Sequence, residues 1–417
     1  MLAAQPATSD ATSLPEGWEQ GMLEDYIERP EYGFTDSASD DPSGTKFLRI
    51  TDIQDGQVDW RTVPYCNCPR EVVASKRLLV GDVVVARIGA TTGKSFFIDA
   101  PPNDAVFASY LIRIRARPAK LLPRFLYFYM QTTAYWAHVD RHKGDRLKGG
   151  VNIPVLESLP VVVPPLKEQA SMVRVLDCIV AAARSETTQA AVSVDLKTSA
   201  LSTIFTSGLR GEATRETEIG SIPESWEIAT VESSVTPLRF DRATQLPTSE
   251  YASTGLLPIV DQGQSLIAGY TDKLEHKLDR PGPVIIFGDH TRALKYVDFD
   301  IALGADGTKP LVPRDCFEPK FLFYALSNLS IPSRGYNRHW KSFAEMQFAK
   351  PRSREEQRDI AIMVDALDRK INLHGMKRAV LEELYQSLLH KLITGEVRVE
   401  HLDLSTLDTP ESSGVVA

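Results

Sequence analysis

Two long stretches of the chain carry apolar residues at helical spacing. The first runs from Leu166 to about Phe205 without proline or glycine, and the second runs from Arg354 to about Ile393. The apolar positions follow mostly in steps of three and four: Val173, Leu176, Val180, Ala183, Ala190, Val194 and Leu201, and then Ile360, Val364, Leu367, Ile371, Leu381, Leu384 and Leu388. This pattern predicts two amphipathic helices with a coiled-coil seam, each roughly 60 Å long at about 1.5 Å per residue. Gly208 and Gly395 stand where left-handed caps would end these helices.

The rest of the chain shows strand and turn patterns. β-branched runs between turn residues predict strands within residues 81–89 and 282–289, and shorter strands follow at 95–98 and 294–297. An aromatic-rich helical stretch comes next in both places, from Phe125 to Trp136 and from Phe321 to Leu329. We therefore expect two mixed α+β globules of about 150 residues each.

The two halves of the chain repeat one another. Leu14–Glu19 returns as Ile222–Glu227, and Pro123–Phe128 returns as Pro319–Tyr324, at offsets of 208 and 196 residues. Pro164–Gln169 is matched by Arg352–Gln357 at an offset of 188, and Ser207-Gly208 by Thr394-Gly395 at 187. Four landmarks in the same order indicate two copies of one unit, with length changes between the landmarks.

The repeat predicts a division of the chain into two globules and two helices. The expected boundaries are residues 14–165 for the first globule, 166–211 for the central helix, 212–352 for the second globule and 353–398 for the C-terminal helix. The tails at 1–13 and 399–417 are small and polar, and we expect them to be disordered. Two helices of this kind bury their seams against each other or against a partner, and the simplest arrangement is an antiparallel pair.

Composition narrows the class of protein. The 417 residues are 43% hydrophobic and 24% charged, which excludes a disordered or collagen-like chain. No apolar run reaches the roughly 18 residues that a membrane helix needs, and four cysteines do not make a disulfide framework. We expect a reduced, cytoplasmic protein that has no contact with a membrane. The net charge of −8 hides two basic regions, +7 over residues 107–150 and +5 over 319–352.

Signatures of catalysis and of metal binding are missing or weak. The chain has no phosphate-binding GxxxxGK[ST] loop, no amino-methylation motif of the Asp/Asn-Pro-Pro-aromatic kind, no dinucleotide fingerprint and no HExxH pair. Cys66-Asn67-Cys68 has no second cysteine pair to complete a zinc site. A nuclease-like Glu-x-Lys pattern occurs at Glu318-Pro319-Lys320 and again at Glu275-His276-Lys277, and two unrelated occurrences show how little the pattern means alone.

Several short motifs, taken in order, resemble one protein family. They are the two Pro-Glu-x-Trp openings, the segments 81–94, 107–115 and 297–308, the Pro-Pro-Leu-x-Glu-Gln start of the first long helix, and the end of the second helix before Thr394-Gly395-Glu396. Together they resemble the specificity (S) subunit of type I restriction–modification systems, from Leu14 to about Arg398. The second helix departs from the pattern at its start, because Pro351–Gln357 lacks a second proline.

The resemblance implies a non-catalytic DNA-binding subunit. Each globule would be a target recognition domain that reads one half of a bipartite, asymmetric site in double-stranded DNA, and the two helices would set the spacer. The same helices would dock two methyltransferase (M) subunits, which carry S-adenosylmethionine and methylate adenine. Restriction (R) subunits, with ATP and Mg²⁺, would complete the nuclease. This chain itself would bind no cofactor and no metal.

We place the DNA contacts in the basic stretches before each helix and in two hairpin turns. Both stretches combine cations, an amide and glycine, which suits phosphate and base contacts. The candidate residues are Thr92, Lys94, Arg141, Lys143, Arg146, Lys148 and Asn152 in the first copy, and His290, Arg292, Arg334, Tyr336, Asn337, Arg338 and Lys341 in the second. Trp18 and Trp226 are interpreted as core anchors, and Gln169 and Gln357 as structural residues at the helix starts.

Two other functions stay open. One is a DNA endonuclease with an unrecognised metal site around Glu318 and Lys320, which would cleave DNA in the presence of magnesium. The other is a specificity subunit of a different DNA-modification defence system, which would read DNA in the same way for other partners.

Overall fold

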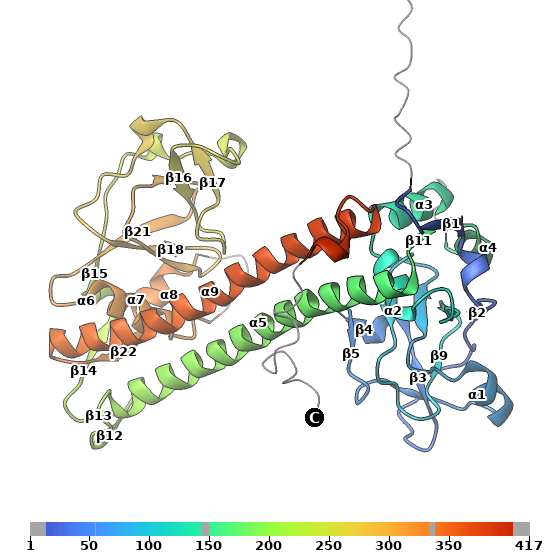
Figure 1. Ribbon diagram of the computed structural model, residues 1–417. Helices are drawn as coiled ribbons and strands as arrows, with labels where there is room; N and C mark the ends of the chain where they lie inside the picture. The colour runs from blue at the N-terminus through green and yellow to red at the C-terminus, as the bar shows by residue number, and fades with distance from the viewer. Residues whose placement is uncertain (1–13, 55, 144–149, 333–337, 403–417) are drawn as a thin grey trace, which may run out of the picture. The chain divides into compact units, whose positions relative to one another are not determined.

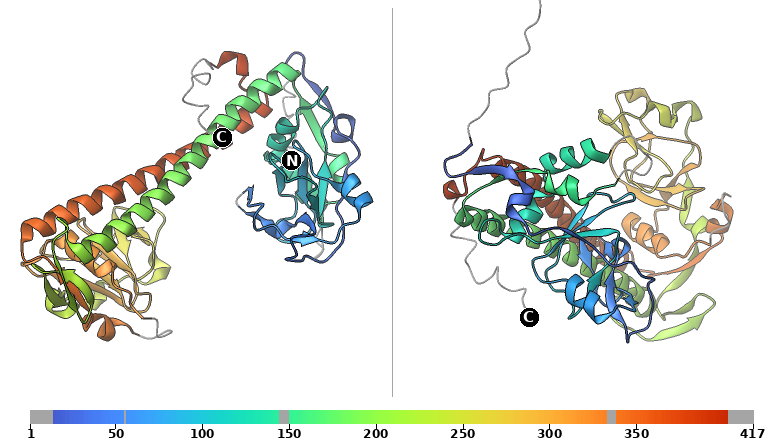
Figure 2. Two further views of the ribbon diagram at one scale, coloured as in Figure 1. Left: turned by 90° about the horizontal axis from the view of Figure 1, so that it is seen from below. Right: turned by 90° about the vertical axis from the view of Figure 1, so that its right-hand side faces the viewer.

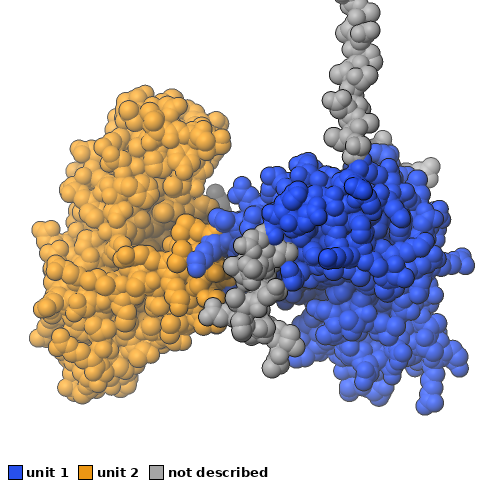
Figure 3. All heavy atoms as spheres, in the orientation of Figure 1, with its two compact units in different colours: residues 1–185, 377–417 blue, residues 186–376 orange. Residues whose placement is uncertain are grey.

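The computed structural model describes residues 14–54, 56–143, 150–332 and 338–402, which belong to two compact units (Figure 3). Unit 1 consists of residues 1–185 and 377–417, and unit 2 consists of residues 186–376. Unit 1 is therefore assembled from both ends of the chain, whereas unit 2 is one continuous segment. The fold is mixed α and β, as the sequence predicts (Figure 1).

Unit 1 contains two main sheets. The four-stranded sheet is antiparallel throughout, in the order β2 (Glu31–Tyr32), β10 (Leu111–Ile114), β7 (Val83–Ala86) and β8 (Ser95–Phe97). The three-stranded sheet has the order β6 (Tyr65–Cys66), β3 (Thr45–Leu48) and β9 (Val106–Phe107), with β3 parallel to β9 and antiparallel to β6. Two antiparallel pairs complete the unit: β1 (Glu19–Met22) with β11 (Pro160–Val163), and β4 (Ile53–Gln54) with β5 (Gln57–Val58).

Unit 2 repeats this topology strand for strand in its two main sheets. Its four-stranded antiparallel sheet has the order β15 (Val235–Pro237), β21 (Thr308–Pro313), β18 (Val284–Gly288) and β19 (Leu294–Val297). Its three-stranded sheet has the order β17 (Gly269–Thr271), β16 (Leu257–Val260) and β20 (Ala302–Leu303), again with one parallel and one antiparallel pair. The outer pair is β14 (Glu227–Thr230) with β22 (Gln347–Lys350), and β12 (Thr214–Thr217) pairs with β13 (Gly220–Pro223). The internal repeat is thus confirmed.

One of the two inner strands of each four-stranded sheet, β7 or β18, has a hydrophobic core on either face. In β7, Val83 and Val85 point into one hydrophobic cluster and Val84 into another. In β18, Ile285 and Phe287 belong to one cluster while Val284 and Ile286 belong to a second. Because side chains alternate across a strand, an uninterrupted β-branched run is what a strand covered on both faces requires.

Short helices cover the sheets. Unit 1 has α1 (Arg70–Lys76), α2 (Pro123–Tyr129), α3 (Thr133–Lys143) and α4 (Ile153–Glu157), and unit 2 has α6 (Val231–Ser234), α7 (Pro319–Ser327) and α8 (Trp340–Ala344). The 3-10 turns are η1 (Leu23–Tyr26), η2 (Ile50–Asp52), η3 (Arg242–Thr244), η4 (Thr248–Glu250), η5 (Leu274–His276) and η6 (Val399–His401).

The single helical stretch expected from Phe125 to Trp136 is wrong, because α2 ends before α3 begins. The hydroxyl of Thr132 donates to the Tyr129 carbonyl at 2.7 Å and accepts from the Tyr135 N–H at 3.3 Å. One threonine side chain thus ends the first helix and caps the second, a local bond that competes with a continuous helix.

The two predicted long helices are present. Helix α5 (Leu166–Ser207) leaves unit 1 and enters unit 2, and α9 (Arg354–Ile393) leaves unit 2 and enters unit 1. In unit 1 their ends share a core that includes Met172, Leu176, Leu389 and Leu392. In unit 2, Ile204 and Val364 lie in one core, and Lys197 Nζ of α5 is 2.6 Å from Asp368 Oδ1 of α9. Within each unit the helices run in opposite directions (Figures 1 and 2).

The predicted seam is wrong at two positions. Val194 and Leu384 are 45% and 43% exposed, while Ser193 beside the first of them is buried. A straight helix drifts by about 20° per seven residues against a fixed stripe, so positions chosen by steps of three and four leave the buried face over a long helix. No helix among the described residues is long and apolar enough to span a lipid bilayer.

A buried glutamine fixes the start of each long helix in the same way. In unit 1, Gln169 accepts from the Leu122 N–H at 2.8 Å and donates to the carbonyls of Pro164 and Lys120 at 2.8 and 3.0 Å. In unit 2, Gln357 accepts from the Glu318 N–H at 2.8 Å and donates to the carbonyls of Pro351 and Cys316 at 3.0 and 3.5 Å. Both glutamines are fully buried, so their structural role is confirmed.

The tryptophan of each Pro-Glu-x-Trp opening is tied to the same helix. The indole N–H of Trp18 donates to Glu168 at 2.9 Å, and that of Trp226 donates to Glu356 at 3.2 Å. Both rings are buried, which confirms them as core anchors. Gly208 and Gly395 follow α5 and α9 at φ values of 69° and 76°, so the predicted left-handed caps are present.

Candidate nucleic-acid interface

In unit 2, a turn and a basic segment distant in the sequence meet at the end of the inner strand β18. Asp289 follows β18 directly, and its carboxylate is buried. Its Oδ1 accepts from the backbone N–H groups of His339 and Trp340 at 3.0 and 2.8 Å. Its backbone carbonyl also accepts from the His339 N–H at 2.9 Å. The end of the basic stretch is therefore held against the β18–β19 turn by one acidic residue.

The turn itself contacts the other side of the same stretch. Arg292 adopts a left-handed conformation with φ at 63°, and its guanidinium donates to the Ile331 carbonyl at 2.9 Å. The His290 N–H donates to Gln262 Oε1 at 3.3 Å. Both side chains are half-buried, so the turn is a packed element that borders the surface.

Unit 1 brings the corresponding segments together with different bonds. The Val151 N–H donates to the Arg87 carbonyl at 2.9 Å, just beyond β7, where His339 meets Asp289 in unit 2. The Tyr135 hydroxyl of α3 donates to the Gly93 carbonyl of the β7–β8 turn at 2.6 Å. The topology therefore places the turn and the chain that follows the basic stretch at one sheet edge in both units. The sequence did not show this convergence.

The structure places nine of the fourteen predicted contact residues. Lys94, Arg141, Asn152, Arg338 and Lys341 are exposed, His290 and Arg292 are half-buried, Thr92 is buried, and Lys143 is the last residue of α3. The Thr92 hydroxyl donates to the Gly89 carbonyl at 2.7 Å, and the Asn152 amide oxygen accepts from the Val155 N–H at 3.0 Å as the cap of α4. The side chains of Thr92 and Asn152 therefore already hydrogen-bond to backbone groups of unit 1. Arg146, Lys148, Arg334, Tyr336 and Asn337 lie outside the described residues.

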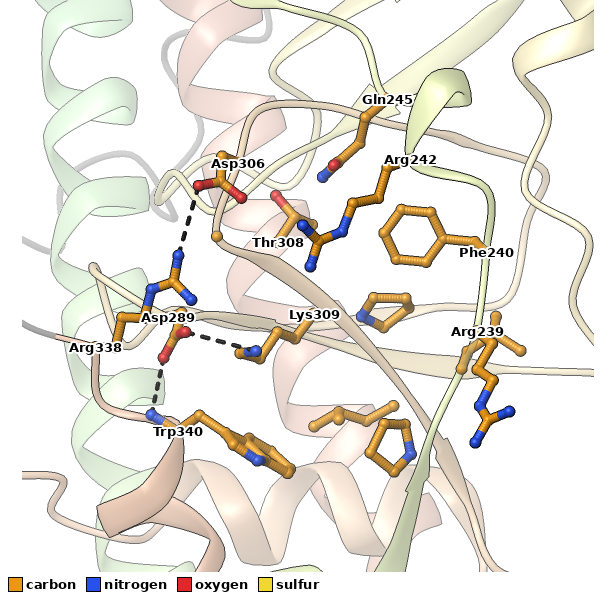
Figure 4. A pocket seen from close by; sticks show the side chains of 15 residues that line it. Arg239, Phe240, Arg242, Gln245, Asp289, Asp306, Thr308, Lys309, Arg338 and Trp340 are labelled. Atoms are coloured by element: carbon orange, nitrogen blue, oxygen red, sulfur yellow. Dashed lines mark hydrogen bonds and ion pairs between the residues drawn. The ribbon is translucent and has the colours of Figure 1, made fainter.

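A pocket of about 450 Å³ opens beside this edge in unit 2 (Figure 4). Its lining contains four cations (Arg239, Arg242, Lys309 and Arg338), two carboxylates (Asp289 and Asp306), the amide of Gln245 and the rings of Phe240 and Trp340. Sequence reasoning missed Arg239, Arg242 and Lys309. The signal was present as Arg239-Phe240-Asp241-Arg242 directly after an edge strand, but only the sheet order shows that this segment borders the loop that carries Arg338.

Two further cations near these sheets belong to the core. Burial lowers the pKa of Lys295, whose ammonium donates to the Asp261 carbonyl at 2.7 Å. Burial and the neighbouring Arg115 lower the pKa of Arg113, whose guanidinium donates to Glu31 at 2.6 Å. Both side chains are 4% exposed, so they hold the interior of their sheets and do not reach a duplex.

The residues of the nuclease alternative have structural partners. Glu318 caps α7, because its carboxylate accepts from the Phe321 N–H at 2.6 Å. Lys320 Nζ lies 2.5 Å from Asp365 Oδ1 on α9. Among the described residues, no three His, Cys, Asp or Glu side chains are placed to hold a metal ion together. Cys66 is a buried thiol whose pKa is raised to about 12 by burial.

Comparison with known proteins gives a consistent result. Residues 15–192 match the family model described as "Type I restriction modification DNA specificity domain". The chain is 23% identical over 406 residues to a putative type I restriction enzyme MjaX specificity subunit of Methanocaldococcus jannaschii, which covers 93% of this chain and 95% of that protein. It is also 23% identical over 207 residues to the type I restriction enzyme EcoBI specificity subunit of Escherichia coli, which covers 49% of this chain and 43% of that protein.

Solved structures share the fold. The S subunit of a type I restriction–modification system from M. genitalium superimposes with a TM-score of 0.61 at 12% identity, covering 93% of this chain and 98% of that one. A chain from a study of complex assembly in a type I system has a TM-score of 0.52 at 18% identity, covering 92% and 100%. The solved structures confirm the fold class predicted from the sequence, and the family match and the relatives above confirm the predicted resemblance.

Proposed function

We propose that this chain, which is similar along nearly its whole length to type I specificity subunits, is the DNA-recognition subunit of a type I restriction–modification complex. One observation carries the proposal. The two units share strand order, helix starts and tryptophan anchors, yet they present different polar side chains at the same sheet edge. A repeated scaffold with two unlike surfaces suits the reading of two unlike half-sites.

Each unit would read one half of a bipartite, asymmetric site in duplex DNA. Exposed cations at the edge, such as Lys94 in unit 1 and Lys341 in unit 2, would neutralise phosphates and fix the register. Base edges in the major groove would be read by side chains of the same loops. The chain would supply no catalytic group and bind no cofactor.

The two long helices would set the gap between half-sites and dock the methyltransferase subunits. Apolar side chains are exposed at equivalent places on both helices. Val192 and Leu196 of α5 correspond to Val380 and Leu384 of α9, each pair 188 residues apart in the sequence. Exposed apolar residues at equivalent positions of both helices favour two copies of one partner, because two similar surfaces can each bind the same subunit.

The partners would bring the chemistry. Two M subunits would carry S-adenosylmethionine and methylate adenine, and R subunits would add ATP- and Mg²⁺-dependent cleavage. With this chain alone, neither methylation nor cleavage of DNA is expected.

A map of methylated adenines tests the proposal. Cells that produce this chain together with the neighbouring M subunit should methylate a split motif with a fixed gap, and cells with M alone should not. If both proteins co-purify and no split motif appears, the chain reads DNA for a different defence system, and the type I assignment is wrong.

The spacer role has its own test. Removing about one heptad from α5 should change the gap or abolish methylation, because a heptad shortens the helix by about 10 Å. The two half-sequences should stay unchanged. A change in a half-sequence with an unchanged gap would contradict the spacer role.

A further inference from the structure

The pocket of unit 2 holds cations without matching acids. Arg239 and Arg242 are exposed, and among the described residues neither guanidinium has a carboxylate partner. The two other cations have long contacts: Arg338 lies 3.8 Å from Asp306, and Lys309 lies 3.6 Å from Asp289. Four positive charges against two negative ones leave the pocket with an excess of two positive charges. An anionic group is the ligand that such a lining favours.

The cations stand on well-fixed backbone. Strand β15 pairs with β21, and the Leu238 N–H donates to the Pro310 carbonyl at 2.9 Å, directly before the first arginine. The Gln245 amide donates to the Ala305 carbonyl at 2.9 Å, shortly after the second. The intervening segment is therefore anchored at both ends. A segment whose backbone is already fixed loses less entropy when its side chains bind an anion.

On the opposite side of the pocket, Asp289 fixes the positions of Trp340 and Lys309. Asp289 holds the Trp340 N–H at 2.8 Å and attracts Lys309, whose ammonium lies 6.0 Å from the centre of the Trp340 ring. In Figure 4, Arg242 and Arg338 approach the pocket from different elements, Lys309 lies below them, and Arg239 stands apart at the right. The walls come from β21, the segment after β15 and the chain after residue 337, so the pocket borders the proposed DNA-reading edge.

The segment of unit 1 that corresponds to Arg239 and Arg242 carries no cation. The strand that corresponds to β15 is β2, and the segment after it, residues 33–44, contains no lysine or arginine. It carries Asp36, Asp40 and Asp41 instead, and Asp36 Oδ2 accepts from the Asn67 N–H at 3.0 Å. The basic pocket is a feature of one copy of the repeat, so it is not needed to build the shared scaffold.

We propose that this pocket binds a phosphodiester of the DNA backbone, with Arg239 and Arg242 as phosphate-binding residues and Asp289 as the residue that positions Lys309 and Trp340. The inference rests on the proposed DNA-binding function and adds an asymmetry to it. Unit 2 supplies a sequence-independent anchor next to its half-site, and unit 1 lacks that anchor. Contacts of this kind set affinity and register without reading bases.

The salt dependence of DNA binding tests the proposal. The full chain is titrated against labelled duplex DNA between about 50 and about 300 mM salt, because each phosphate contact contributes about 0.9 to the slope of log affinity against log salt. Because both arginines would bind one phosphodiester, the variant carrying Arg239→Gln and Arg242→Gln should lower the slope by about 0.9 and weaken binding by about tenfold at the lower salt, equally for any sequence. Both residues are exposed, so the variant is expected to fold, and its thermal melt checks this.

A matched control removes the same charge elsewhere in unit 2. Arg314 and Arg352 are exposed and do not line the pocket, so Arg314→Gln with Arg352→Gln should leave the slope unchanged. If the pocket variant and the control behave alike, the pocket assignment is wrong while DNA binding itself stands. If the unaltered chain binds no duplex at any salt, the proposed function and the pocket assignment both fail.

A free nucleotide is the other source of a phosphate ester. Adenosine monophosphate is titrated against the same proteins by calorimetry. No binding at micromolar concentrations is expected, because one phosphate without the duplex leaves most of the interface empty. Tight binding that the arginine variant abolishes, with DNA affinity unchanged, would make the pocket a nucleotide site and overturn the proposal.

Discussion

The two units share the contacts at the start of their long helices, and they differ in the side chains at the sheet edge. At the helix starts, the buried glutamine, the tryptophan–glutamate bond and the basic–acidic pair of Arg124 with Asp177 or Lys320 with Asp365 recur with the same geometry. At the sheet edge, unit 2 has a basic pocket organised by Asp289, whereas in unit 1 the residue after β7 is Arg87 and the segment after β2 contains no arginine. Contacts that join a globule to its helix are retained, whereas exposed side chains at the edge differ freely because folding does not depend on them.

The largest expected effect tests whether the glutamine contacts are equivalent. Gln169→Leu would leave one N–H and two carbonyls without partners in unit 1, and Gln357→Leu would do the same in unit 2; the bonds to the Pro164 and Pro351 carbonyls are buried and the others are partly buried. At about 1–3 kcal/mol per unsatisfied group, each change should lower the free energy of unfolding of its own unit by about 4 kcal/mol. Hydrogen exchange, read separately for each unit, measures the loss.

The exposed Gln386 provides the control for these variants. Gln386→Leu should change the free energy of unfolding by less than about 0.5 kcal/mol, because the side chain is exposed on α9. A large loss for one buried glutamine and none for the other would show that the two helix starts are not energetically equivalent.

A smaller loss of stability should distinguish the glycine that ends α9 from the glycine that ends α5. Gly395→Ala would place a Cβ 2.5 Å from Pro15 Cγ at a φ of 76°, whereas Gly208→Ala would meet Pro223 Cγ at 3.3 Å. The left-handed backbone costs an alanine about 1–2 kcal/mol at both sites, and the clash with Pro15 adds to it in unit 1. We expect losses of about 3 kcal/mol for Gly395→Ala and about 1.5 kcal/mol for Gly208→Ala, measured by denaturant unfolding.

Gly375→Ala is the control in which neither a left-handed backbone nor a steric clash opposes the alanine. Gly375 lies inside α9, and apart from the backbone of its own helix no atom of the described residues lies within 4 Å of the place that a Cβ would take. Gly375→Ala should therefore stabilise the helix by about 1 kcal/mol. Equal losses at Gly395 and Gly208 would mean that Pro15 moves away at no cost.

The smallest expected effect is a pH dependence of the free energy of unfolding that Asp365 of α9 contributes in unit 2. Burial raises the pKa of Asp365, but hydrogen bonds from Lys320 and Arg369 outweigh it and hold the pKa below the usual 3.8. The lowered pKa stabilises the fold above pH 3.8, and this contribution is lost as the pH falls through the folded-state value. Asp365→Asn should therefore cost about 1 kcal/mol at about pH 7 and almost nothing at about pH 2.

The unfolding free energies of Asp365→Asn and of the unaltered chain, compared at the two pH values, measure this contribution. A cost that is the same at both pH values would show that the carboxylate acts through packing alone. The matched change Asp177→Asn removes the corresponding pair with Arg124 in unit 1.

Much of the scaffold could be predicted because short-range patterns in the sequence specify it. Apolar spacing indicated both long helices, β-branched runs between turn residues indicated β7 and β18, and glycine marked both helix ends. The repeat predicted the shared topology. The break between α2 and α3 was missed, because it depends on how one threonine, Thr132, distributes its hydrogen bonds.

The candidate site was less accessible to sequence reasoning. Basic stretches before each helix were found by charge, but the role of Asp289 depends on two backbone N–H groups some fifty residues away. Arg242 joins Lys309 and Arg338 only because β15 lies beside β21. Such groupings follow from strand order, which charge and periodicity do not specify.

Unit 1 takes its last core residues from the end of the chain, and this affects the order in which the protein can form during synthesis. Leu389, Leu392 and Val399 complete the core that begins with Trp18 and Leu23, whereas unit 2 needs nothing beyond residue 376. A ribosome therefore releases every part of unit 2 before it releases the last pieces of unit 1. The N-terminal globule can therefore complete its apolar core only after all of unit 2 has been synthesised, whereas domains generally fold as units in N-to-C order.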